Sequence, residues 1–302
     1  MRVDAHQHIW TEPLLAALSE RDELPLVRYE NGLAILHSAA EQPYVIDVRA
    51  EAPGARSLRV RQDGLDRAVI AISSPIGIEA LPRKGALELI DAHLTGVERL
   101  GPEFEYWGPL AIDDADPDEV DQLLGRGSIG ISLTAGALAG PDRLRQLRPV
   151  LERVSAHGVP LFVHPGRAPR QLPAPSDLGE PLWWRPLTDY VAQMQAAWLT
   201  FAALGRREHP DLQIVFAMLA GGAPLHSERL AARGGPPIDL RDPNTFYETS
   251  SYGPEAVEMT ARITGFDQLV YGSDRPVIDP QSTGSDSLLQ VNAAKLLTMV
   301  AA

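Results

Sequence analysis

Short apolar runs alternate with longer amphipathic segments over most of this 302-residue chain. Strand side chains repeat every two residues and helix side chains every 3.6, so the short runs predict buried strands and the longer segments predict helices. The predicted strands are residues 2–8, 68–73, 106–112, 129–133, 159–164, 212–218, 245–249 and 268–272. The predicted helices are residues 85–100, 117–124, 141–157, 187–206, 224–232, 254–264 and 287–300.

Eight strand-like runs, each followed by a helix or a long loop, are typical of repeated βα units. The pattern predicts an α/β fold, a single (β/α)8 TIM barrel that forms one domain over residues 1–302. The open, doubly wound alternative lacks its usual signature, because no Gly-x-Gly-x-x-Gly follows the first strand.

Two segments are longer than ordinary βα connections. Residues 9–61 are predicted to be an insertion after the first strand, irregular except for a hairpin over residues 25–37 with Asn31-Gly32 as its turn. Residues 165–186, after the fifth strand, are rich in proline and are predicted to form a lid-like loop.

Composition narrows the choice of partners. The net charge of −13 argues against nucleic acid as a partner. No apolar stretch has the length of a membrane span, and no signal peptide is evident, so we expect a cytoplasmic protein that acts on a small molecule. A homo-oligomer is left open. The absence of cysteine restricts metal ligands to His, Asp and Glu.

Three histidines and one aspartate stand at the ends of predicted strands. His6 and His8 are two residues apart and should face the same way, while His164 and Asp274 end or follow the fifth and eighth strands. Barrel strands end at one rim, so these four side chains are expected to bind one divalent ion. We expect zinc, with manganese as the alternative, in a mononuclear site, because neither lysine lies at the end of a strand.

The segments around these residues carry a family resemblance. Val-Asp-Ala-His6-Gln-His8-Ile-Trp, Phe-Val-His164-Pro and Tyr-Gly-Ser-Asp274-Arg-Pro resemble the amidohydrolase-related branch of the metal-dependent TIM-barrel hydrolases. This branch of the amidohydrolase superfamily includes lactone hydrolases and non-oxidative decarboxylases, and the opening and closing motifs are most similar to the lactonases. The resemblance implies a histidine at the end of the sixth strand, where this chain has Met218.

The leading functional hypothesis is metal-dependent hydrolysis of a small cyclic ester or amide. Asp274 would be both metal ligand and base, and His226 is the candidate for the proton donor that Met218 cannot be. An ordinary surface position for His226 is the equal alternative. The candidate substrate-binding residues are Arg275, Tyr252, Trp10 and Arg167.

Two other functions remain open at this point. The first is non-oxidative decarboxylation of a small aromatic or unsaturated acid at the same metal, with Asp274 as the proton donor to carbon. The second is a barrel that binds a metal or a small ligand without catalysis, because the sixth-strand imidazole is replaced by Met218.

Overall fold

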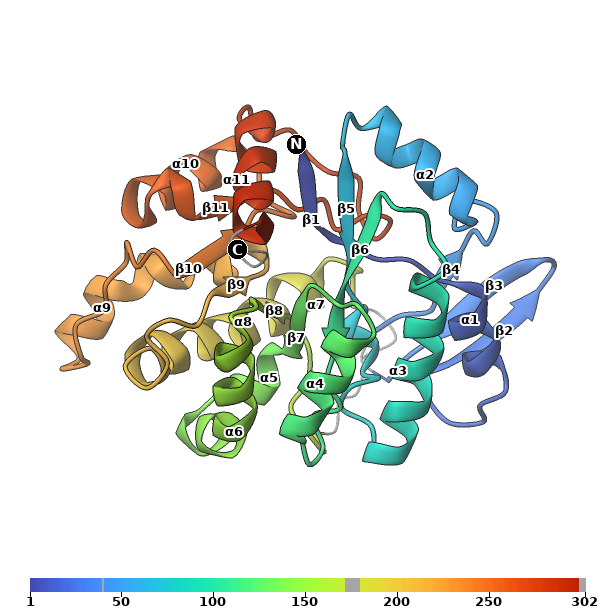
Figure 1. Ribbon diagram of the computed structural model, residues 1–302, viewed down its shortest axis with the longest axis horizontal. Coiled ribbons are helices and arrows are strands. Elements are labelled where there is room, and N and C mark those ends of the chain that lie inside the picture. The colour runs from blue at the N-terminus through green and yellow to red at the C-terminus, as the bar shows by residue number, and fades with distance from the viewer. Residues whose placement is uncertain (40, 172–179, 299–302) are drawn as a thin grey trace.

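The computed structural model describes residues 1–39, 41–171 and 180–298. Eight parallel strands form one sheet in the order in which they occur along the chain, with the helices around it (Figure 1). The strands are β1 (Val3–Gln7), β5 (Arg67–Ile70), β6 (Phe104–Pro109), β7 (Gly130–Thr134), β8 (Leu161–His164), β9 (Ile214–Phe216), β10 (Thr245–Glu248) and β11 (Leu269–Val270). Each one overlaps a predicted strand.

The first and last strands meet and make the sheet into a barrel. The Ala5 amide donates to the Tyr271 carbonyl at 2.9 Å, and Gln7 pairs with Arg275 just beyond β11. Inside the barrel, the Trp107 and Phe162 rings stack with centroids 5.1 Å apart, and Trp107 Nε1 donates to the Ala5 carbonyl at 2.9 Å. The predicted TIM barrel is confirmed.

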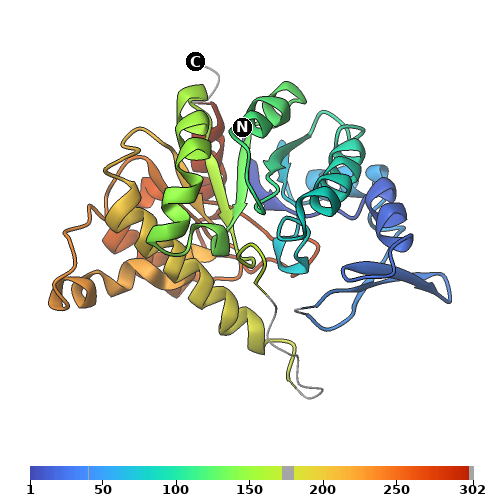
Figure 2. The same cartoon turned by 90° about the horizontal axis from the view of Figure 1, so that it is seen from below.

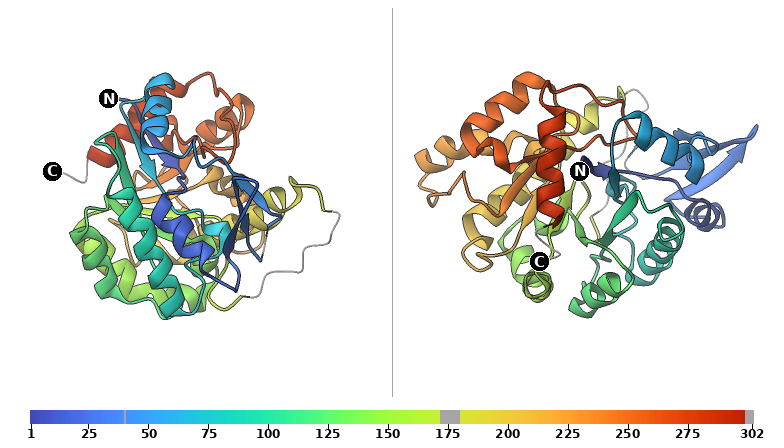
Figure 3. Two further views of the ribbon diagram at one scale, coloured as in Figure 1. Left: turned by 90° about the vertical axis from the view of Figure 1, so that its right-hand side faces the viewer. Right: turned by 45° about the horizontal axis from the view of Figure 1, so that its top comes forward.

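The helices cover the outside of the barrel (Figures 1 and 3). Helix α6 has the bounds that the sequence predicts, because Pro141 suits its first turn and Gly158 ends it in the left-handed region at φ 63°. The helices after β5 are α3 (Arg83–Val97), α4 (Pro117–Gly125), α5 (Ala135–Leu138), α6 (Pro141–His157), α7 (Trp184–Leu187), α8 (Asp189–Thr200), α9 (Ser227–Ala232), α10 (Pro254–Thr264) and α11 (Asp286–Thr298). Residues 299 and 300 of the predicted last helix lie outside the described residues.

The segment between β1 and β5 is more regular than the sequence predicts. The predicted hairpin is confirmed, with Asn31 and Gly32 at φ 52° and 81° in its turn. A third strand joins the hairpin, and two unpredicted helices flank the resulting sheet, so the expectation of an otherwise irregular segment is wrong. These elements are α1 (Glu12–Ser19), β2 (Leu26–Glu30), β3 (Leu33–His37), β4 (Tyr44–Ile46) and α2 (Pro53–Gln62).

The three-stranded sheet β2–β3–β4 lies at the same end of the barrel as the chain around residues 180–190 (Figures 2 and 3). The Gln42 side-chain amide donates to the Glu180 carbonyl at 2.5 Å and joins the two segments. Residues 172–179 of the predicted lid-like loop lie outside the described residues. Within the described part of the chain, every helix is too short or too polar to cross a membrane.

Candidate active site

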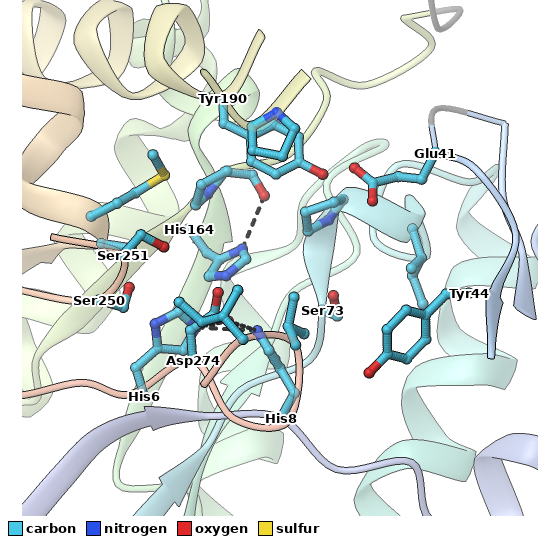
Figure 4. Close-up of a pocket in the computed structure, with 18 of the residues that line it drawn as sticks. His6, His8, Glu41, Tyr44, Ser73, His164, Tyr190, Ser250, Ser251 and Asp274 are labelled. Carbon is cyan, nitrogen blue, oxygen red and sulfur yellow. Dashed lines mark hydrogen bonds and ion pairs between the residues drawn. The ribbon is translucent and has the colours of Figure 1, made fainter. Parts of the chain in front are cut away.

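The four predicted metal ligands lie together at the ends of strands β1, β8 and β11. One ligand atom from each of His6, His8, His164 and Asp274 lies within 4.8 Å of the others. His8 Nε2 is 3.0 Å from Asp274 Oδ1 and 3.2 Å from His6 Nε2, and the carboxylate of Asp274 retains 17% exposure (Figure 4). The barrel has therefore gathered three imidazoles and one carboxylate from distant parts of the chain.

The other ring nitrogen of each histidine is held by an acceptor. His8 Nδ1 donates to the Ala71 carbonyl at 2.8 Å, and His164 Nδ1 donates to the Pro165 carbonyl at 3.0 Å. His6 Nδ1 lies 3.2 Å from Glu248 Oε2. This pattern assigns the proton of each neutral ring to Nδ1 and directs the lone pair of Nε2 into the cluster. Such a donor set fits a divalent transition-metal ion.

Burial and charge separate the pKa values of two of these histidines. The pKa of His164 lies well below its ordinary value, because burial penalises the imidazolium and His6 and His8 add positive charge. Burial alone would lower the pKa of His6, but the carboxylates of Glu248 and Asp274 outweigh it and raise that pKa. His164 is therefore held as a neutral imidazole, the form that binds a metal.

Glu248, at the end of β10, is a site residue that the sequence analysis missed. Its side chain is fully buried, and its Oε2 accepts from Ser250 Oγ at 2.8 Å and from the Met218 amide at 3.1 Å, in addition to facing His6. The Ser250 amide donates to Oε1. Glu248 therefore fixes the ring of His6, as carboxylates behind metal-binding histidines commonly do. Its only sequence signal is a lone acidic residue at the end of an apolar strand.

Met218 begins a turn of unusual handedness after β9. Residues 218–222 all have positive φ, from 43° at Met218 to 74° at Gly222. Left-handed backbone costs about 1–2 kcal/mol for each residue other than glycine, and such strain is often found at functional sites. The turn places Met218 on the pocket wall, where the family resemblance leads us to expect a histidine.

The four ligands form the floor of a cavity of about 210 Å³. A cavity of about 150 Å³ is known to hold benzene, so this volume suits one substituted ring. Apolar side chains form most of the wall, and no Lys or Arg is among the described residues that line it. The wall includes Trp10, Leu36, Glu41, Tyr44, Pro75, Ile76, Tyr190, Met218, Tyr252 and Ile278.

Two of the four predicted substrate-binding residues line this cavity. Trp10 is buried, with its ring centroid 6.1 Å from that of Tyr44, and its Nε1 has no hydrogen-bond partner among the described residues. Tyr252 is partly buried on the wall, and burial raises the pKa of its hydroxyl. Both can contact a bound ring.

The two predicted arginines do not line the cavity. Arg275 pairs with Asp63, with its Nε 2.9 Å from a carboxylate oxygen, although the preceding residue, Asp274, belongs to the floor of the cavity. The guanidinium of Arg167 packs against Gly77, where a Cβ atom would lie 1.8 Å from Nη2. The structure does not support binding of a substrate carboxylate by either residue.

The structure also leaves His226 outside the pocket. Its side chain is exposed at the end of the turn that precedes α9, and its Nε2 lies 3.4 Å from Gln195 Nε2. His226 stands at the end of the turn that begins with Met218, and it is not among the described residues that line the cavity. This position does not fit the predicted role of a proton donor to the substrate.

A family model described as Amidohydrolase matches residues 3–297. The chain belongs to the amidohydrolase family. The match covers nearly the whole sequence and confirms the resemblance that the His6, His164 and Asp274 motifs indicate. A comparison with curated proteins finds no match.

Several solved structures share the fold of this amidohydrolase. IDCase of Metarhizium anisopliae superposes with a TM-score of 0.73 at 16% identity, covering 99% of this chain and 97% of that chain. The 2,6-dihydroxybenzoate decarboxylase from Rhizobium superposes with a TM-score of 0.67 at 18% identity. The superposition covers 99% of this chain and 98% of that chain. A dihydroxybenzoic acid decarboxylase from Polaromonas sp. JS666 superposes with a TM-score of 0.64 at 15% identity, and its structure contains manganese and 2-nitroresorcinol. The superposition covers 99% of this chain and 97% of that chain.

These comparisons correct the leading functional hypothesis. The solved neighbours include named decarboxylases of hydroxylated benzoates, which match the alternative prediction and contradict the lactonase-like hydrolase. The opening and closing motifs surround the predicted metal ligands, so they indicate a metal site and do not separate hydrolysis from decarboxylation.

Proposed function

We propose that this amidohydrolase is a metal-dependent, non-oxidative decarboxylase of a small aromatic acid. The observation that carries the proposal is the combination of a floor of three histidines and one aspartate with a largely apolar cavity of about 210 Å³. The named decarboxylases that share the fold support the same reaction.

His6, His8, His164 and Asp274 would hold the ion, since their ligand atoms converge and the Nδ1 atoms of the histidines are otherwise engaged. A divalent ion held by these residues would act as a Lewis acid and stabilise negative charge on the substrate. The nitrogen and oxygen donors suit both zinc and manganese. The manganese bound to the Polaromonas enzyme favours manganese over the zinc expected from sequence.

Asp274 would move the proton, because it is the one carboxylate among the four floor residues. In decarboxylation the bond between the ring carbon and the carboxylate breaks, its electron pair stays on carbon, and CO₂ leaves. The carbon then takes up one proton, which Asp274 would take from solvent and deliver. Hydrolysis needs two proton transfers in succession, one from the attacking water and one to the leaving group, which two groups or one carboxylate can perform. With the thioether of Met218 on the wall and His226 outside, the pocket suits the simpler demand.

The apolar wall contributes to the same reaction. Trp10, Ile76 and Met218 line the cavity together with the metal-binding residues and present apolar surface to a bound acid. A charged carboxylate loses solvation in such surroundings, whereas neutral CO₂ does not. The wall therefore favours conversion of the charged carboxylate to neutral CO₂, completed when the ring carbon takes up its proton.

The test is CO₂ release from a panel of hydroxybenzoates by protein loaded with manganese or zinc. We expect release from at least one acid and about one equivalent of metal by elemental analysis. Asp274→Asn should lower the rate by at least a hundredfold. Asp279→Asn changes an exposed carboxylate five residues away and should leave the rate unchanged. Metal-loaded protein that releases no CO₂ from any acid in the panel would refute the proposal.

A further inference from the structure

The cavity has a second polar end that the proposed reaction does not use. Figure 4 places Glu41 and Tyr190 at one end of the pocket and His6, His8 and Asp274 at the other. Glu41 follows β3 and belongs to the segment inserted between β1 and β5. It is the only described carboxylate on the wall apart from the floor residue Asp274.

Glu41 has an unmet hydrogen-bonding capacity. Its Oε1 is buried without a hydrogen-bond partner among the described residues. Burial raises the pKa of Glu41 to about 7, although the positive charge of Arg185 acts in the opposite direction. Arg185 itself already pairs with Glu180 at 3.1 Å and with Asp189 at 3.8 Å. A buried acceptor without a partner is costly and gains from a donor on a ligand.

The segment that carries Glu41 is joined to the chain that precedes α7. The neighbouring Gln42 donates to the Glu180 carbonyl, and Glu180 in turn accepts from Arg185. These contacts hold the segment that carries Glu41 against the chain that leads into α7 and α8. The carboxyl group of Glu41 therefore lines the cavity from a segment that is held to the chain before α7.

We propose that Glu41 determines which acids the pocket accepts, by binding a hydroxyl or amino group at the end of the substrate remote from the metal ligands. The inference rests on the proposed function for the identity of the reactive end. A second carboxylate at the remote end would face the buried carboxyl group of Glu41, and the two groups could not both be ionised without repulsion. No Lys or Arg among the described wall residues could pair with it. The substrate class is thus an aromatic monocarboxylic acid with a remote hydrogen-bond donor.

The experiment measures binding rather than turnover, so that it does not depend on decarboxylation. The probes are 2-hydroxybenzoates that carry an amino, methyl or carboxylate group at the same ring position, titrated calorimetrically into manganese-loaded full-length protein. The best amino probe should bind at least tenfold more tightly than its methyl analogue, and the carboxylate probe should bind most weakly. The variants are Glu41→Leu and Glu41→Gln, with Glu30→Gln on the exposed end of β2 as the matched control.

Glu41→Leu should bind the methyl probe at least as tightly as the amino probe, and Glu41→Gln should improve binding of the carboxylate probe at least fivefold. Glu30→Gln should keep the wild-type ranking. An unchanged ranking in both Glu41 variants, equal binding of all probes by the wild type, or no binding of any probe would overturn the role of Glu41. The expected ranking without CO₂ release would retain that role and refute the decarboxylase proposal alone.

Discussion

Replacing Glu248 by glutamine tests whether the carboxylate behind His6 sets metal affinity. The two oxygens of Glu248 together accept from His6 Nδ1, the Met218 amide, Ser250 Oγ and the Ser250 amide. A glutamine side chain offers one oxygen, so an NH₂ group must face at least one buried donor. That mismatch costs about 1–3 kcal/mol of stability.

The change should also weaken the metal site. His6 would exchange a charged acceptor for a neutral one, and hydrogen bonds to charged groups are about twice as strong. Loss of such a partner typically lowers metal affinity by about 10–100-fold, which is about 1.4–2.7 kcal/mol.

Competition with a chromophoric chelator measures the affinity, and thermal unfolding measures stability. Glu12→Gln, an exposed glutamate at the start of α1, is the control and should change neither quantity. The reasoning would be refuted if folded Glu248→Gln protein bound manganese within twofold of the wild-type affinity.

Three further predictions test other parts of the structure. His164→Ala should lose most of its metal by elemental analysis while its circular dichroism stays native; full metal content would contradict the ligand assignment. Burial raises the pKa of Glu79 from 4.5 to about 7, so the folded state holds its proton more tightly. Stability should then fall by up to about 3 kcal/mol between pH 4.5 and 7, and Glu79→Gln should flatten this slope in pH-dependent unfolding. Gly221→Ala should cost more than about 2 kcal/mol in denaturant unfolding, because its Cβ would lie 2.8 Å from the Val191 carbonyl oxygen. A Cβ at Gly222 would make only an ordinary contact, 3.8 Å from Leu225 Cδ1, so Gly222→Ala should cost about 1 kcal/mol; equal losses would contradict the steric argument.

The sequence predicts the barrel well and the inserted segment poorly, for a physical reason. Strands buried on both faces leave continuous apolar runs, and α6 and α10 begin with proline at the first turn. In α2 the buried side chains are Val60 and Arg56, and the latter pairs with Glu51 and Gln7. A helix that buries a guanidinium has no apolar stripe for a periodicity argument to detect.

The same contrast holds for the site. His6, His8, His164 and Asp274 could be predicted because histidine and aspartate at strand ends are distinctive residue types in distinctive places. Glu41 and Glu248 could not, because only the tertiary structure distinguishes them. Glu248 contacts His6, and Oε1 of Glu41 is buried without a hydrogen-bond partner among the described residues. Arg275 and His226 show the converse, because closeness in sequence to a site residue does not fix the direction of a side chain.

The two ends of the pocket come from different parts of the fold, and the packing of the barrel constrains them to different degrees. Its floor belongs to barrel strands, where any change disturbs the closed sheet and the core. Its remote end is formed by Tyr190 of α8 and by Glu41, which lies between β3 and β4 in the segment from α1 to α2. Helix α1 is anchored to α3 by the close approach of Thr11 to Gly96. The three-stranded sheet can therefore be exchanged between its two flanking helices while the floor is left intact. In evolution, such an arrangement lets the same metal-binding floor serve new substrates when the peripheral sheet is replaced.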